Sequence, residues 1–487
     1  MHHHNSKRKK LIKIIAVYLG MTISTIAIVT FIILIVLGFR FDINRQQIEQ
    51  YAFLQFNSTP IGSMVAVDGR DISGRTPNKT SVPEGTHEVV VWRDGYETWR
   101  KTLYVKSGTL TWLSHILMIP NKLSVEPVEK YDAVYMSLAS ADGKYMAVQQ
   151  YADKPSFDLV DLSVDTVKSV NLTIPKKDYS EAYNQSANHS FRINKWDHSE
   201  RYLLIQHNYN DRVEWLVLDS QDENNSKNIT KLFDLDFSNV EFSGNGGNIM
   251  FVLESGNIRK IDTGAGTISK PLVSKVKQFN LYDQNIVTYI GDDDSGARLV
   301  GLYRDGDETP FIIREIPASD IDSLSVASTH YFNQDYVAII QGKKVDILNG
   351  SYRNSIINNT PNLALLKTFE IVENAKHIGF SPDGQYFLAQ SGANFTSYDL
   401  EYDNLTSSTV DNSSAVSSLK WLNDSYFWSD NGGNLSIREF DGSNPRSINK
   451  VTLGQDIVIT HSGRYIYSID SAATSGYQLQ RVRLILP

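Results

Sequence analysis

The stretch that decides the fold reads "IGFSPDGQYFLAQ" and covers Ile378–Gln390. An Asp-Gly pair, which favours a tight turn, precedes an aromatic residue and a short apolar run typical of a buried β-strand. The same order of turn, aromatic residue and apolar strand recurs along the chain. The aromatic position is occupied by Tyr145, Tyr202, Tyr336, Tyr386, Tyr426 and Tyr465, and degenerate copies occur at Asn248 and Ile286.

The spacing of these copies indicates the architecture. From Tyr145 to Tyr465 they span 320 residues, so one unit is about 46 residues long. Short strands at this period are typical of propeller blades, because a four-stranded sheet has two faces to bury and radial stacking buries both. We therefore predict a β-propeller over residues 121–487, with eight blades, or seven if one degenerate copy is an insertion. A two-sheet sandwich array is the alternative.

Ring closure and one resemblance refine this prediction. We expect a strand near Lys122–Val128 to pair with the last strand, "YQLQRVRLIL". The copy at Ile378–Gln390 resembles the TolB-type repeat of WD-repeat-like propellers. The resemblance covers most of residues 125–487 and is specific only where a copy carries an Asp-Gly turn.

An apolar segment near the N-terminus predicts a membrane helix. Residues 14–38 carry no charge, and a helix of that length spans about 37 Å, enough to cross a ~30 Å hydrocarbon core. A cleaved signal peptide has a shorter apolar core and a small-residue cleavage site, which "VLGFRFDINR" lacks. A buried core helix rarely runs this far without polar residues. We assign no role to His2–His4.

The flanking charges orient this helix. Five basic residues precede it, so residues 1–13 are predicted to be a cytoplasmic basic stub. Residues 14–38 then form a single transmembrane helix, residues 39–52 a linker, and the bulk of the chain lies outside the cell membrane.

The segment after the linker reads as a small β-domain. The stretch "SVPEGTHEVVVWRDGYETWRKTLYVKSG" runs from Ser81 to Gly108 and places Asp94–Gly95 between two alternating runs. Asp-Gly in this position predicts a hairpin with a type I′ turn, which needs positive φ at both central residues. Pro83 and Gly85 mark a further turn upstream.

Six short elements in this region closely resemble the PEGA domain. The matching positions are Pro60, Asp68, Gly69, Thr76, Pro77, Pro83, Glu84, Gly85, Gly95 and Tyr96. The resemblance covers residues 53–120 and implies a small β-sandwich, common in bacterial and archaeal envelope proteins and often found beside a membrane segment. It implies no catalytic residues, so the module is expected to act as a spacer or as a glycan-facing adaptor.

Composition excludes several classes of function. The 487 residues contain no cysteine, which rules out disulfides, thiolate metal sites and a cysteine nucleophile. Residues 1–40 hold six basic residues and no acid, so beyond them 41 basic face 55 acidic residues, a balance of −14. An acidic exterior argues against a nucleic-acid partner, because a phosphate backbone needs a basic surface.

Catalytic and phosphate-binding motifs fail when tested. There is no G-x-S-x-G elbow, and no hydrolase domain follows the propeller region. His87 begins a zincin-like pair, yet Val91 stands where the second histidine is required. The "QGKK" at Gln341–Lys344 lacks the leading glycine and the hydroxyl residue of a phosphate loop.

Two clusters have both a functional and a structural interpretation. Asp292, Asp293 and Asp294 are candidates for binding a hard cation such as Ca²⁺, although successive acids point in different directions and favour a solvated hairpin tip. The aromatic-rich Lys420–Asp430 is able to stack on sugar rings, but packing between blades is the preferred interpretation. We predict no catalytic residue, no metal site and no cofactor.

These observations predict a non-catalytic, membrane-anchored binding or scaffold protein of the cell envelope. Its propeller face is expected to recognise an envelope protein or a cell-wall glycan, since loops on a rigid scaffold carry recognition. The alternatives are a propeller glycan lyase or hydrolase and an assembly factor of the Tol-propeller kind. Two facing carboxylates, or His, Tyr and Arg together, in the central channel favour catalysis. An apolar plug favours a scaffold.

Overall fold

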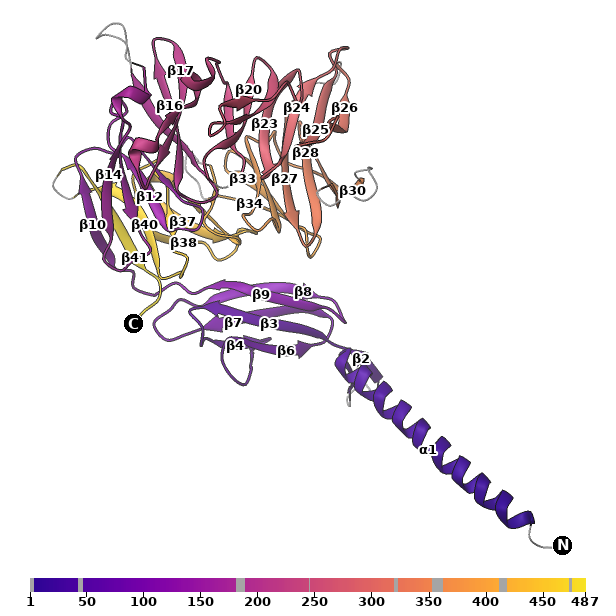
Figure 1. Cartoon of the computed structure of the whole chain (residues 1–487). Helices are drawn as coiled ribbons and strands as arrows, with labels where there is room; N and C mark the ends of the chain where they lie inside the picture. Colours follow the sequence, from indigo (N-terminus) through magenta and orange to yellow (C-terminus); the bar gives the residue numbers. More distant parts are fainter. Residues whose placement is uncertain are drawn as a thin grey trace. The chain divides into compact units, whose positions relative to one another are not determined.

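The chain divides into two compact units in the computed structural model (Figure 1), which describes residues 4–42, 47–180, 189–244, 246–318, 323–352, 362–410, 418–472 and 475–487. The first unit contains Met1–Lys122 together with Ile485–Pro487, and the second contains Leu123–Leu484. The predicted propeller range of 121–487 includes Ile485–Pro487, which this division places in the first unit. His2 and His3 lie outside the described residues.

The first unit begins with the apolar helix. Helix α1 runs over His4–Val36, so it starts inside the predicted basic stub and ends two residues before Gly38. Every residue from 11 to 37 is exposed, and the segment Leu11–Val36 has a mean hydropathy of 2.6. Gly38 ends the helix with φ +84°, where a Cβ would come within 2.7 Å of the Tyr51 carbonyl oxygen.

The predicted linker 39–52 contains regular structure. Strands β1 (Phe39–Asp42) and β2 (Gln47–Gln50) form an antiparallel pair in which Arg40 lies opposite Glu49. Opposite charges at facing positions stabilise such a pair. The Arg40 guanidinium also lies 5.7 Å from the centre of the Tyr51 ring. This short strand pair lies between the helix and the rest of the unit.

Two sheets enclose one apolar core in the rest of the first unit. The core includes Leu54 and Phe56 from one sheet and Val89 and Val91 from the other, all fully buried. The three-stranded sheet has the order β6 (Asn78–Val82), β3 (Ala52–Thr59) and β9 (Leu110–Leu117), and the four-stranded sheet has the order β5 (Arg70–Asp71), β4 (Met64–Val67), β7 (Gly85–Trp92) and β8 (Trp99–Val105).

The predicted hairpin forms, but its turn is wider than predicted. Strands β7 and β8 pair antiparallel with Val91 opposite Trp99, which leaves a six-residue loop between Trp92 and Trp99. Gly95 has φ +84°, whereas Asp94 is not in the left-handed region, so the turn is not type I′. The loop is wide because Tyr96 folds inward to 6% exposure in the core.

One histidine joins two turns of this unit. His87 Nδ1 lies 2.6 Å from Asp68 Oδ2, and its Nε2 lies 2.8 Å from the Pro83 carbonyl oxygen. The hydrogen bond with His87 lowers the pKa of Asp68. The two contacts of His87 hold the turns at Asp68 and Pro83 together.

The last residues of the chain complete the core of the first unit. Leu486 packs against this core, and its backbone N–H donates to the Tyr96 hydroxyl at 2.8 Å. A Cβ on Gly95 would approach the Leu486 Cδ1 to 3.0 Å, so glycine leaves the space that the leucine occupies.

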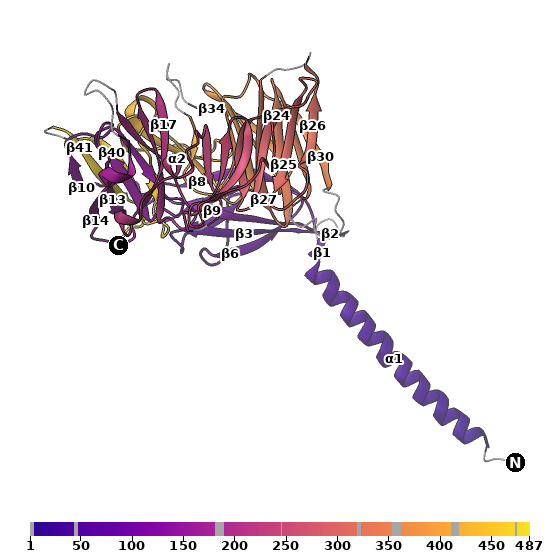
Figure 2. The same ribbon diagram turned by 45° about the horizontal axis from the view of Figure 1, so that its top comes forward.

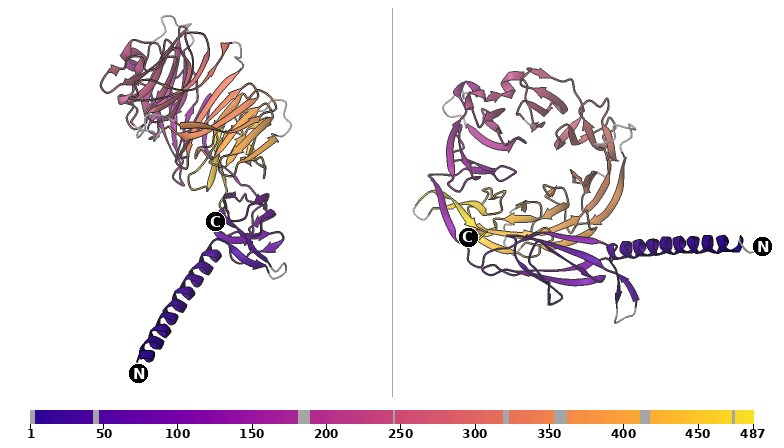
Figure 3. Two further views of the ribbon diagram at one scale, coloured as in Figure 1. Left: turned by 90° about the vertical axis from the view of Figure 1, so that its right-hand side faces the viewer. Right: turned by 60° about the horizontal axis from the view of Figure 1, so that its bottom comes forward.

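The second unit is a ring of sheets. Its described residues form eight four-stranded antiparallel sheets, and Figure 3 shows that they follow one another around a centre. The first strands of neighbouring sheets contact each other, as β27 (Leu324–Tyr331) and β31 (His377–Phe380) do. Figure 2 shows the strands of the fourth and fifth sheets standing side by side. This arrangement is a β-propeller.

The first four sheets follow the chain order without a crossover. Their strands are β11 (Met136–Ala139), β12 (Tyr145–Gln149), β13 (Ser156–Asp161) and β14 (Lys168–Thr173); β15 (Ser190–Trp196), β16 (Tyr202–Tyr209), β17 (Arg212–Asp219) and β18 (Lys227–Asn228); β19 (Asn239–Phe242), β20 (Ile249–Glu254), β21 (Asn257–Asp262) and β22 (Thr267–Ile268); and β23 (Val276–Asp283), β24 (Ile286–Asp292), β25 (Arg298–Arg304) and β26 (Phe311–Ile316). A short helix α2 (Ile229–Phe233) follows β18.

The next three sheets repeat this order, and the last one departs from it. The repeating strands are β27, β28 (Gln334–Gln341), β29 (Lys344–Ser351) and β30 (Asn362–Glu370); β31, β32 (Tyr386–Ser391), β33 (Asn394–Asp399) and β34 (Asn404–Thr409); and β35 (Lys420–Trp421), β36 (Tyr426–Ser429), β37 (Asn434–Glu439) and β38 (Arg446–Lys450). The closing sheet has the order β10 (Val125–Tyr131), β41 (Tyr477–Arg483), β40 (Tyr465–Ser471) and β39 (Val458–Ile459).

The closing sheet joins the two ends of the ring. Strand β41 pairs antiparallel with β10, with Val125 opposite Val482 and Tyr131 opposite Tyr477. The predicted pairing of the Lys122–Val128 region with the last strand is confirmed.

The core of this unit lies between its sheets. One cluster joins Ala147 and Phe157 of the first sheet to Phe191 and Leu203 of the second, and further clusters join successive pairs around the ring. Burying a large apolar side chain contributes about 1.5–3 kcal/mol, so each sheet depends on its neighbours for stability. This shared burial is the physical reason why the sequence repeats.

Candidate binding pocket

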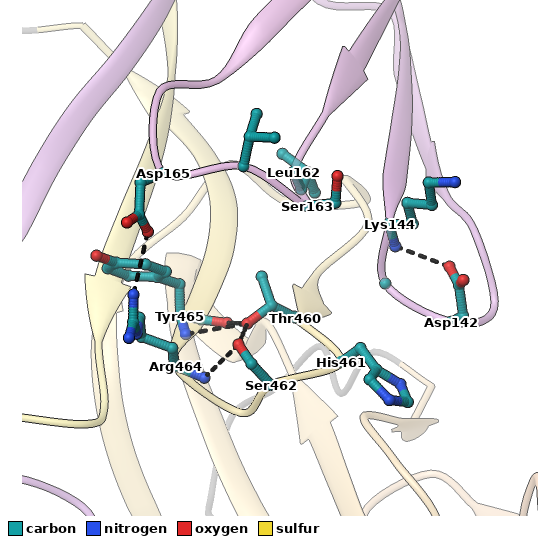
Figure 4. Close-up of a pocket in the computed structure, with 12 residues that line it drawn as sticks. Asp142, Lys144, Leu162, Ser163, Asp165, Thr460, His461, Ser462, Arg464 and Tyr465 are labelled. Atoms are coloured by element: carbon teal, nitrogen blue, oxygen red, sulfur yellow. Dashed lines mark hydrogen bonds and ion pairs between the residues drawn. The ribbon is translucent and has the colours of Figure 1, made fainter.

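A cavity of about 590 Å³ opens where three turns of the second unit meet (Figure 4). The turns join β11 to β12, β13 to β14, and β39 to β40, so the cavity lies between the closing sheet and the next sheet of the ring. The lining residues are Asp142, Gly143, Lys144, Leu162, Ser163, Val164, Asp165, Thr460, His461, Ser462, Arg464 and Tyr465.

Two of these turns are copies of the repeat, and the same contacts build both. The Ser140 hydroxyl accepts a hydrogen bond from the Tyr145 N–H at 2.9 Å, and Thr460 accepts one from Tyr465 at 3.2 Å. The Asp142 carboxylate accepts from the Lys144 N–H at 2.9 Å, which closes the turn. The hydroxyl residue five places before each tyrosine is a signal that the repeat analysis missed.

Gly143 brings the first turn close to the closing sheet. It has φ +71°, and a Cβ there would lie 2.2 Å from the Ile459 carbonyl oxygen. Only glycine permits both the conformation and the close approach.

Paired charges line one side of the cavity. Arg464 Nη1 lies 3.2 Å from Asp165 Oδ1, and Arg481 donates to the Asp165 carbonyl oxygen at 2.8 Å. Lys144 Nζ lies 4.8 Å from the centre of the Tyr145 ring, and the hydrogen bond with Tyr145 raises the pKa of Lys144. Figure 4 shows His461 and Ser462 on the β39–β40 turn, which also carries Arg464. The lining therefore offers cationic, hydroxyl and carboxylate groups to a polar ligand.

A second carboxyl group, that of Glu200, is hydrogen-bonded to Asp142. Burial and the hydrogen bond with Asp142 raise the pKa of Glu200 to about 7. Burial also acts to raise the pKa of Asp142, but its hydrogen bonds with Glu200, Lys144 and Ser140 lower it overall. Glu200 therefore takes up and releases its proton near neutral pH, while Asp142 stays ionised there.

A buried histidine network lies in the neighbouring sheet. His207 is fully buried; its Nδ1 lies 3.0 Å from Glu214 Oε2 and its Nε2 lies 3.0 Å from His189 Nδ1. Glu214 also accepts from the Ser180 N–H at 2.9 Å. Burial acts to raise the pKa of Glu214, but the bonds with His207 and Ser180 outweigh it and lower that pKa to about 2. The spacing of these residues in the sequence does not predict this network, because its members come from separate elements.

The carboxylates of the acidic cluster named in the sequence analysis pair with basic side chains and a backbone N–H group. Asp292 Oδ1 lies 2.6 Å from Arg298 Nε, Asp294 pairs with Lys275, and Asp293 accepts from the Ser295 N–H at 2.8 Å. In the described parts of the chain, no group of three or more His, Asp or Glu side chains has an arrangement that could hold a metal ion.

The aromatic stretch Lys420–Asp430 packs into the interior. Phe427 and Trp428 are at most 3% exposed, and the Trp421 ring lies 4.3 Å from that of Phe427. This contact set agrees with the packing interpretation preferred for the stretch.

The inner strands carry paired charges. Lys195 on β15 lies 2.5 Å from Glu241 on β19, and Lys420 on β35 lies 3.4 Å from Asp456 beside β39.

The solved structures that match this chain do so at low identity and low TM-score. The β-propeller domain of Cps50 (Swd1) from Myceliophteria thermophila is 12% identical with a TM-score of 0.41, and the alignment covers 68% of this chain and 100% of that one. Oligogalacturonate lyase in complex with manganese is 12% identical with a TM-score of 0.41, covering 75% and 98%. Hsv2p of Kluyveromyces lactis is 11% identical with a TM-score of 0.38, covering 73% and 100%.

The sequence comparisons match part of the first unit to a known family. None of the curated proteins compared with this chain matches it. Asp68, Pro83 and Tyr96, whose contacts are described above, are motif positions of the predicted resemblance. That prediction is confirmed, because residues 53–120 match the PEGA domain family.

Proposed function

We propose that this chain is a membrane-anchored, extracytoplasmic binding or scaffold protein of the cell envelope. Helix α1 serves as an uncleaved anchor with its N-terminus in the cytoplasm. The PEGA unit is a β-sandwich spacer beyond it, and the second unit is an eight-bladed propeller in which each four-stranded sheet is one blade. The propeller binds an envelope protein or a cell-wall glycan and performs no catalysis.

One observation carries the anchoring proposal. Every residue of the apolar segment Leu11–Val36 is exposed, and none is buried inside the described chain. A water-exposed surface of that size is unfavourable, whereas a lipid bilayer covers it without cost. The basic residues before the helix favour a cytoplasmic N-terminus.

The binding proposal is supported by the pocket. Its groups are polar and mixed in charge, as suits a hydroxyl-rich or zwitterionic ligand better than an apolar one. The acidic balance beyond residue 40 argues against nucleic acid as the partner.

A second candidate function rests on the carboxyl pair. Glu200 shares a hydrogen bond with Asp142, which lines the pocket, and burial raises the pKa of Glu200 to about 7, so an exchangeable proton lies beside the pocket. A two-carboxylate hydrolase would require these groups to separate, because they flank the scissile bond. This alternative places a glycan in the same pocket and adds its cleavage.

Binding experiments on the full chain in nanodiscs test both candidates. We expect a ligand found by glycan array or envelope pull-down to lose affinity in Lys144→Ala combined with Arg464→Ala. Lys154→Ala is the matched control, because its Nζ lies 3.9 Å from the Tyr151 ring centre in a similar way but outside the pocket. Turnover of a bound glycan that Glu200→Gln abolishes would favour the enzyme, and ligand binding unchanged in the double variant would refute the pocket.

Protease accessibility tests the topology. In intact cells, external protease is expected to degrade the second unit and spare residues 1–13. A second unit that is cleaved only after the cells are opened would overturn the proposed orientation.

A further inference from the structure

Several large side chains of the first unit remain exposed outside the helix. Their exposed fractions are 67% for Ile48, 64% for Tyr104, 46% for Leu110 and 53% for Trp112. We call these four residues the proximal patch. Several exposed apolar and aromatic side chains near one end of a small domain often mark a contact with a partner or a membrane.

Hydrogen bonds place this region at the end of α1. The Tyr51 N–H donates to the Gly38 carbonyl oxygen at 2.9 Å, and the Gln50 side-chain amide donates to the Leu37 carbonyl oxygen at 3.0 Å. The Gly108 N–H in turn donates to the Tyr51 carbonyl oxygen at 3.2 Å. The β8–β9 turn therefore lies against the same few residues that receive the end of the helix.

The patch residues lie just beside these contacts. Ile48 is on β2 two residues before Gln50, and Leu110 opens β9 two residues after Gly108. Trp112 follows on the same face of β9, because alternate residues of a strand share a face. Tyr104 lies on β8 in the other sheet, so its exposed ring is on the opposite outer face of the unit, and its hydroxyl donates to Glu84 Oε1 at 2.7 Å.

The chemistry of these residues fits the boundary of a bilayer. Tryptophan and tyrosine are enriched at the level of the lipid headgroups, where their rings are part apolar and part polar. Exposed basic side chains accompany them, namely Arg40 on β1 and Lys106 in the β8–β9 turn, and suit contact with anionic lipid. Leu37, 51% exposed, continues the apolar surface of α1 to the patch.

We infer that the proximal patch rests in the headgroup region of the leaflet where α1 leaves the membrane. The inference depends on the proposed anchoring by α1 and adds to it a second, peripheral contact between the PEGA unit and lipid. Such a contact holds the unit against the bilayer in addition to tethering it.

The chain has no cysteine, so single cysteines can carry a polarity-sensitive fluorophore without any background labelling. Leu110→Cys and Trp112→Cys report on the patch in the full chain in nanodiscs. Ile61→Cys is the matched control, because Ile61 is 64% exposed in the same unit beyond the opposite end of β3. Ser24→Cys reports on insertion of α1.

Labels at positions 110 and 112 are expected to shift to shorter wavelengths and to lose emission when headgroup-quencher lipids are added, while the label at 61 stays unchanged. Lipids with a quencher in the acyl chain report on position 24, which lies near the middle of the predicted span. Acyl-chain quenching at 24 without headgroup quenching at 110 and 112 would overturn the patch contact and leave the anchor intact. Loss of acyl-chain quenching at 24 as well would refute the anchor. A wavelength shift at 110 and 112 that is insensitive to quencher lipids would assign the patch to a protein contact and overturn the inference.

Discussion

The backbone N–H of Asp142 donates to Oε1 of Glu200 at 2.8 Å, which joins two turns that lie 58 residues apart. The folded-state pKa of Glu200 is about 7, above its ordinary value of 4.5, so the folded chain holds this proton more tightly than the unfolded chain does. The stabilising contribution of Glu200 is therefore fully present below pH 4.5 and is lost as the pH rises from 4.5 to 7.

Glu200→Gln should remove this pH dependence. The glutamine amide keeps the size and the acceptor oxygen without gaining a charge at high pH. Allowing for partial solvent screening, we expect the variant to be about 1 kcal/mol more stable than the parent at pH 8 and equally stable near pH 4. Thermal unfolding of the full chain at the two pH values measures the difference. An equal change at both pH values would contradict the assignment of the shift to Glu200.

Glu214→Gln should destabilise the second unit. The carboxylate accepts hydrogen bonds from Ser180 and faces buried His207, and an amide places a donor where an acceptor is needed. We expect a loss of about 2 kcal/mol in unfolding free energy at neutral pH. Because the folded pKa of Glu214 is about 2, the parent should lose this contribution as the pH falls from 4.5 to 2.

Glu223→Gln is the control for this experiment. The Glu223 carboxylate accepts a hydrogen bond from the Thr173 N–H at 2.7 Å at an exposed site. We expect its loss to cost less than about 1 kcal/mol in chemical unfolding. Equal losses in the two variants would argue against the buried network.

Gly143→Ala should disturb ring closure and the pocket together. The added Cβ meets the Ile459 carbonyl oxygen in addition to the strain of a positive φ. Gly266→Ala is the control, because Gly266 has φ +65° with no atom within 4 Å of a new Cβ. We expect the control to lose about 1 kcal/mol of unfolding free energy and Gly143→Ala to lose about 2 kcal/mol more, measured by chemical unfolding. Similar losses in both would show that the neighbouring strand yields freely.

Leu486→Ala should loosen the first unit. Removing the partly buried side chain beside Tyr96 is expected to cost about 1 kcal/mol and to raise hydrogen exchange in residues 93–98. Leu453→Ala, at a position 59% exposed in the second unit, provides the control. Unchanged exchange in residues 93–98 would show that the C-terminal contact does not stabilise the loop.

The repeating part of the fold could be predicted from the sequence because its contacts are local. The turn at Ser140–Tyr145 is built from residues within one copy, so the spacing of such copies reveals the ring. The closing pair β10–β41 followed because a ring needs its two ends to meet. The PEGA motifs were equally readable, since each marks one turn.

The parts that failed depend on tertiary contacts or on weak patterns. The turn at Asp94–Gly95 widens because Tyr96 enters the core, which a dipeptide rule does not include. The carboxyl pair of Asp142 and Glu200 joins turns from different sheets, and no periodicity reports such a meeting. The β1–β2 pair was missed because its alternating run is only four residues long on each strand.

The pairing of β10 with β41 has a consequence for damaged or truncated chains. A stop or a cut before Tyr477 removes the partner of both β10 and β40 and leaves two bare strand edges. Unpaired edges recruit strands from other molecules, so such fragments should aggregate and be degraded. The closing sheet therefore forms only in a chain that contains β41 as well as β10 and β40.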